Sequence, residues 1–74
     1  MNIQSAEQAH RQAVAGRDAA ARRLYEAELA VHDAHQSRIE QWIAAAHDRL
    51  EAAATRYVAA QAEVSALRAA PVAA

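Results

Sequence analysis

Residues 29–43, LAVHDAHQSRIEQWI, lie at the middle of this 74-residue chain and decide its fold. The stretch contains neither glycine nor proline, so a single helix running through it is sterically allowed. It also holds six consecutive residues without a large hydrophobic side chain, HDAHQS at positions 32–37. These residues are therefore either the turn between two helices or the centre of one long helix.

The sequence on both sides of this stretch favours helix. Alanine supplies 24 of the 74 residues, and most others between positions 5 and 70 are good or neutral helix formers. Ser5 followed by Gln8 is typical of a capping box, and Pro71 predicts a helix end near residue 70. Gly16 costs a helix about 1 kcal/mol relative to alanine, which indicates either a close approach or a kink.

Heptad spacing separates the two alternatives. Alanine recurs at every seventh position from Ala6 to Ala34, but the same register then reaches polar residues. The second half has its own heptads, at Ile39, Ala46, Ala53, Ala60 and Leu67, and at Ile43, Leu50, Tyr57 and Val64. Because the register breaks between Ala34 and Ile39, we predict an all-α antiparallel helical hairpin with a coiled-coil-like seam. The alternative is one continuous helix in an antiparallel coiled coil.

A turn centred near His35 predicts which residues face each other. The residue numbers of two facing residues would then add up to 70. In seven of the nine facing pairs, or layers, an alanine would lie opposite a larger side chain. We expect one domain over residues 1–74, with helices at about 5–32 and 38–70, a loop at 33–37 and a tail at 71–74. Ser37 would cap the second helix, together with Glu40.

Such a hairpin buries too little apolar surface to be stable alone. Chains of this length usually need a disulfide, a metal or a partner, and cysteine is absent. Further apolar side chains lie outside the predicted seam, at Val14, Tyr25, Leu29, Trp42 and Val58. We predict that these five residues form an interface. The simplest result is a homodimer forming a four-helix bundle, and a different protein with an apolar helical face would serve equally.

The composition argues against several other classes of function. The net charge of −1 gives no bulk attraction to nucleic acid or anionic membranes, and no apolar run approaches the roughly 20 residues of a membrane span. The amino terminus lacks the features of a signal peptide. We therefore expect a cytoplasmic protein. Its eight basic residues are all arginine, which, with the abundant alanine, indicates a bacterial or phage gene.

Histidine and glutamate spacing suggests metal binding as a second hypothesis. Glu7 and His10 form a Glu-x-x-His pair, the spacing used in di-iron bundles. Glu28, His32 and His35 share one helix face, and His47 lies one turn before Glu51. A di-iron bundle needs two such motifs and two further glutamates, whereas this chain has one motif. We therefore predict no metal and no cofactor, and keep these histidines and glutamates as candidates.

Arginines in the first half suggest a third hypothesis, a small DNA-associated regulator. Arg11, Arg17, Arg22 and Arg23 gather there, but the spacing predicts ion pairs between several of them and acidic residues one turn away. Arg17 lies on the predicted seam, where Glu28 or Glu51 could pair with it. Neither a nucleophilic cysteine nor a glycine-rich phosphate loop is present. We expect a non-enzymatic protein–protein interaction module: an adaptor, an inhibitor or a structural accessory.

Overall fold

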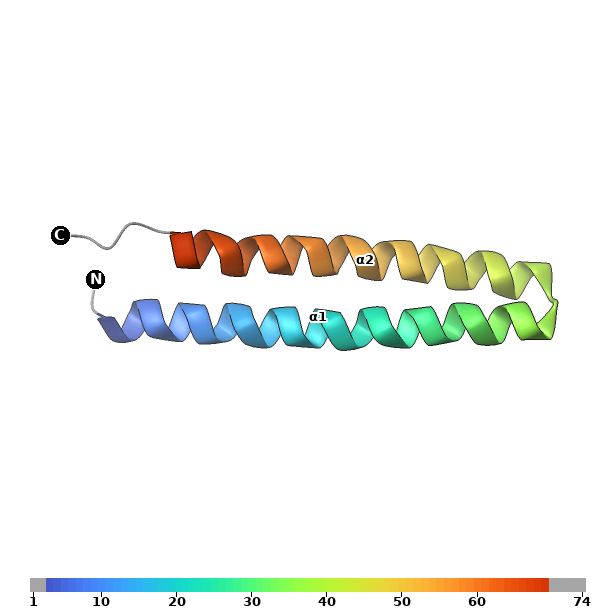
Figure 1. The fold of residues 1–74 in the computed structure, drawn as a ribbon, viewed down its shortest axis with the longest axis horizontal. Coiled ribbons are helices and arrows are strands. Elements are labelled where there is room, and N and C mark those ends of the chain that lie inside the picture. Colours follow the sequence, from blue (N-terminus) through green and yellow to red (C-terminus); the bar gives the residue numbers. More distant parts are fainter. Residues whose placement is uncertain (1–2, 70–74) are drawn as a thin grey trace.

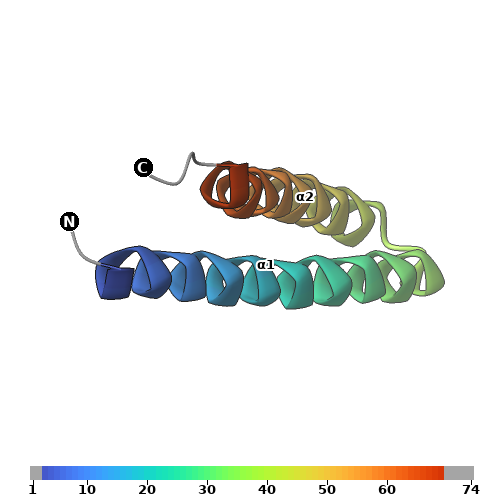
Figure 2. The ribbon, with the colours of Figure 1, turned by 60° about the vertical axis from the view of Figure 1, so that its left-hand side comes forward.

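The protein folds as two antiparallel helices joined by a two-residue turn. The computed structural model describes residues 3–69, in which α1 spans Ile3–Ser37 and α2 spans Glu40–Ala69. Both views show α2 running back alongside α1 (Figures 1 and 2). The molecule measures 58 × 15 × 12 Å. The predicted all-α hairpin is confirmed, and the alternative of one continuous helix is wrong.

The turn is built around a left-handed residue. Arg38 has φ 61°, and its N–H donates to the carbonyl of His35 at 3.2 Å. This is one of the two bonds of a Schellman motif, in which the residue after the helix turns left-handed. The second bond would join the Ile39 N–H to the Ala34 carbonyl. Here the Ser37 hydroxyl lies between them: it accepts from Ile39 N–H at 3.2 Å and donates to the Ala34 carbonyl at 2.5 Å.

The predicted loop at residues 33–37 is wrong, because these residues form the end of α1. Ala34 is a core residue, with 8% of its surface exposed, so extending the helix past it buries one more layer. Ser37 is therefore the last residue of α1, not the cap of α2. Ser5 also lies inside α1, since the helix already includes Ile3. The predicted end near residue 70 and the tail at 71–74 lie outside the described residues.

Moving the turn changes the pairing of the helices by one heptad. With Arg38 and Ile39 at the turn, facing residue numbers add up to 77 instead of the predicted 70. The layers become His10–Leu67, Ala13–Val64, Arg17–Ala60, Ala20–Tyr57, Leu24–Ala53, Ala27–Leu50, Val31–Ala46 and Ala34–Ile43. Each layer contains at least one buried or half-buried residue, and seven set an alanine opposite a larger side chain. Small side chains therefore still lie opposite large ones in the new pairing.

The core between the helices is thin. Among residues 3–69 the buried side chains are Ala13, Ala27, Ala34, Ala46 and Val64. Val64, at 2% exposure, is the single buried residue larger than alanine in that range. Because the core is thin, the hairpin leaves most of its apolar side chains in contact with solvent.

Neither described helix is long and apolar enough to cross a membrane.

Candidate interaction surface

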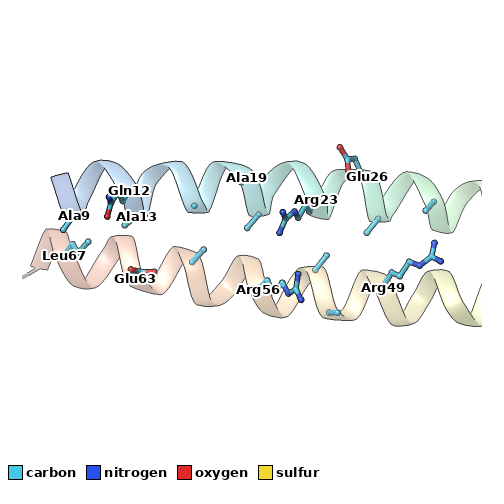
Figure 3. Close-up of a pocket in the computed structure, with 17 residues that line it drawn as sticks. Ala9, Gln12, Ala13, Ala19, Arg23, Glu26, Arg49, Arg56, Glu63 and Leu67 are labelled. Atoms are coloured by element: carbon cyan, nitrogen blue, oxygen red, sulfur yellow. The ribbon is translucent and has the colours of Figure 1, made fainter. Parts of the chain in front are cut away.

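A groove of about 880 Å³ runs along one flank of the hairpin. Its floor is made mainly of alanine, contributed by both helices (Figure 3). The small residues lining it are Ala9, Ala13, Gly16, Ala19, Ala20, Ala27, Ala30, Ala52, Ala53 and Ala60. Because small side chains let helix axes approach closely, this flank suits another helix.

Gly16 lies in this groove and has no steric reason to be glycine within the chain. A Cβ atom built on Gly16 would meet nothing within 4 Å. The helix α1 is continuous through Gly16, so the residue does not end a helical segment. Alanine would therefore fit and would favour the helix by about 1 kcal/mol. Within residues 3–69, therefore, neither a close approach nor an interruption of α1 accounts for Gly16.

Charged side chains border the groove. Arg23 extends from α1 towards α2, while Arg49 and Arg56 extend from α2 towards α1 (Figure 3). Glu26 and Glu63 complete the charged set. Within residues 3–69 the salt bridge present joins Arg17 to Asp18 at 3.2 Å, so the three groove arginines have no carboxylate partner there. The Arg17–Asp18 salt bridge is present in place of the predicted one from Arg17 to Glu28 or Glu51.

The five predicted interface residues lie on different sides of the hairpin. Their exposed fractions are 62% for Tyr25, 46% for Leu29, 59% for Trp42 and 66% for Val58, whereas Val14 is half-buried. Trp42 shares its heptad position with Arg49 and Arg56, which places it on the groove flank. Val14, Tyr25 and Val58 occupy the opposite flank, and Leu29 points away from α2. The five residues are accessible but do not form a single patch.

Two of the histidines come together at the closed end of the hairpin. His35 Nε2 lies 3.0 Å from His47 Nε2, although sequence spacing had placed these residues in separate sets. His32 bonds instead to Gln36 at 3.3 Å, and His10 is half-buried near the open end. Within residues 3–69, no group of three or more histidine and acidic side chains could hold a metal ion. The candidate metal ligands Glu7 and His10 therefore do not come together with a third metal-binding side chain. The same holds for the candidates Glu28, His32 and His35.

The groove residues were not predicted from the sequence, although a heptad signal for them exists. Ala9, Gly16, Arg23 and Ala30 recur at every seventh position, as do Trp42, Arg49, Arg56 and Glu63. Both series lie directly beside the seam, on the flank where the helices leave the groove open. Comparison of the chain with protein-family models, curated proteins and solved structures gives no match.

Proposed function

We propose that this protein is a small, non-enzymatic interaction module that acts as a homodimer, with the alanine groove as its interface. Two hairpins stacked groove to groove would form a four-helix bundle. The observation that supports the proposal most is the combination of an alanine-lined groove with a glycine whose missing side chain leaves open space.

The surface area of the hairpin supports association. A compact monomer of 8.0 kDa exposes about 4,450 Å², whereas this chain exposes 5934 Å². Its radius of gyration is 17.0 Å, against about 11 Å for a compact domain of this length. Standard interfaces bury about 800 Å² on each partner. The excess exposed surface is large enough for such an interface.

The charges around the groove favour a second copy of the same chain as the occupant. Arg56 and Glu63 are one heptad apart on α2, so two antiparallel α2 helices can place each arginine beside the partner's Glu63. Arg23 lies less than one helical turn from the level of Arg56 across the groove, and the same carboxylate would then lie between two arginines. Arg23 and Arg56, which have no carboxylate partner within residues 3–69, would each gain one from the second copy.

This pairing also places Gly16 where the two copies are closest. Gly16 lies level with residue 61 of α2, between Arg56 and Glu63. A two-fold axis that exchanges Arg56 and Glu63 between copies therefore crosses the hairpin beside Gly16. The α1 helices then cross near their glycines, where a side chain would keep them apart. Every neighbouring pair of helices in the resulting bundle is antiparallel.

Substitution of Gly16 by leucine tests the proposal. Gly16→Leu should turn the dimer into a folded monomer, because leucine fills the groove while also favouring the helix. Ala15→Leu is the matched control, since Ala15 is exposed and lies at the heptad position facing away from α2. Sedimentation equilibrium reports the mass, and circular dichroism reports the helix content. The proposal predicts a dimer for the wild type and Ala15→Leu.

Two other outcomes would contradict it. A wild type that stays monomeric at all concentrations would remove the homodimer. A dimer that survives Gly16→Leu but is lost in Tyr25→Ala or Val58→Ala would move the interface to the opposite flank.

A further inference from the structure

The histidine pair at the closed end of the hairpin has the geometry from which a metal site can form. His35 lies in the last turn of α1, and His47 lies in the second turn of α2. Their Nε2 atoms are 3.0 Å apart, their ring centroids are 5.2 Å apart, and the ring planes are at 85°. Both side chains are exposed to solvent. The short turn at Arg38–Ile39 holds their backbones at a fixed separation.

In the present arrangement a hydrogen bond joins the two rings. A neutral imidazole has one N–H donor and one lone-pair acceptor. One Nε2–H can therefore donate to the lone pair of the other Nε2, with the two nitrogens on the facing edges of the rings. This hydrogen bond leaves the Nδ1 atom of the donor ring free to take the proton. The pair can consequently present two Nε2 lone pairs after the proton moves to Nδ1 through solvent.

Two imidazole nitrogens bound to one metal ion are separated by almost the same distance as the Nε2 atoms of His35 and His47. Metal–nitrogen distances are about 2.0–2.1 Å, which puts cis ligands about 2.9 Å apart at a right angle and about 3.4 Å apart in a tetrahedron. The observed 3.0 Å lies within this range. Imidazole is a suitable ligand for zinc, copper and nickel.

We infer that His35 and His47 form a site between the helices for a divalent transition-metal ion that imidazole binds, such as nickel(II), copper(II) or zinc(II). Rotation of the two exposed rings turns both lone pairs towards one ion, and water completes the coordination. The site lies on the flank opposite the alanine groove, because both histidines occupy the heptad positions on that side of the seam. It is therefore independent of the proposed dimer interface.

Titration of the full chain with nickel(II) in a non-coordinating buffer tests the inference by calorimetry. We expect one ion per chain for the wild type, and loss of this binding in both His35→Gln and His47→Gln. His32→Gln and His10→Gln are matched controls that should bind like the wild type. Because the ion would join two helices of the folded chain only, nickel should also raise the Tm of the wild type and His32→Gln. The Tm of His35→Gln should not rise.

Three results would overturn the inference. Equal binding by the wild type and His35→Gln would assign the ion to another group, such as the terminal amine. An absence of binding by the wild type would leave the pair as a hydrogen bond between helices. Binding without a rise in the Tm of the wild type would place the ion away from the contact between the two helices.

Discussion

At the residue scale, the position of the turn depends on two residues, Ser37 and Arg38. Arg38 adopts a left-handed conformation that usually belongs to glycine. The Ser37 hydroxyl bridges the Ile39 N–H and the Ala34 carbonyl, so the end of α1 and the start of α2 are joined by one side chain. The hairpin closes here at some conformational cost, because a non-glycine residue in this region is disfavoured by about 1–2 kcal/mol.

Replacement of Arg38 by glycine should therefore stabilise the hairpin. Glycine removes the left-handed penalty but is more flexible in the unfolded chain, so the expected net gain is up to about 1 kcal/mol. Arg22→Gly is the control: Arg22 is exposed inside α1, where glycine should cost about 1 kcal/mol. Thermal unfolding followed by circular dichroism measures both. A lower Tm for Arg38→Gly than for the wild type would contradict the turn described here.

At the element scale, the main feature is the register in which the two helices pair. The pairing that follows from a turn at Arg38–Ile39 places Ala27 opposite Leu50, whereas the pairing predicted from the sequence places it opposite Ile43. The two registers differ by seven residues, or about 10.5 Å along a helix. This distance is larger than the Cα separation that a disulfide can span.

Introduced cysteine pairs distinguish the two registers, since the chain has no cysteine of its own. Ala27→Cys with Leu50→Cys should form a disulfide within one chain under mild oxidation, because these residues face each other. Ala27→Cys with Ile43→Cys should keep its thiols free. Thiol titration and peptide mapping at low protein concentration measure the outcome. A disulfide formed readily by the second pair but not by the first would restore the register predicted from the sequence.

The sequence predicts the hairpin but not its turn, for a specific physical reason. Ala13, Ala20, Ala27 and Ala34 repeat at seven-residue intervals, so moving α2 by one heptad still sets small side chains opposite large ones. The ends of the seam distinguish the registers. A sum of 70 pairs Val31 with Ile39 and Ile3 with Leu67, whereas a sum of 77 has no pair of two large aliphatic side chains.

The candidate site was predictable to a smaller extent. Exposure of Tyr25, Trp42 and Val58 follows from the heptad pattern, but their flank depends on the register and on how each helix is rotated. The His35–His47 pair could not be predicted with a loop at 33–37, because His35 then has no helical position. Arg38 gives no sequence signal for its left-handed conformation, since glycine or asparagine is the usual residue there.

At the scale of the whole molecule, the hairpin resembles one half of a bundle. Its core contains one buried side chain larger than alanine among residues 3–69, and large side chains such as Tyr25 and Trp42 remain exposed. Three groove arginines lack a carboxylate partner within that range. In the proposed dimer, a second copy would cover the groove and provide carboxylates for Arg23 and Arg56, so the dimer would have a specific pattern of charges.

Exchange of charges should test that pattern. Arg56→Glu places like charges together at both symmetry-related contacts. We expect it to raise the dissociation constant of the dimer by about tenfold, because two exposed ion pairs are reversed in sign. Glu63→Arg should have the same effect. The double variant should dimerise again, and an equimolar mixture of the two single variants should form a heterodimer. Sedimentation at low and high salt measures each step. Equal dimerisation by all variants would contradict the proposed pairing.

Native mass spectrometry of the wild-type chain, purified without chelator and sprayed over a range of concentrations, tests the association of two hairpins most directly. We expect a dimer at twice the 8.0 kDa chain mass, with the dimer fraction rising with concentration. A monomer at every concentration would contradict it.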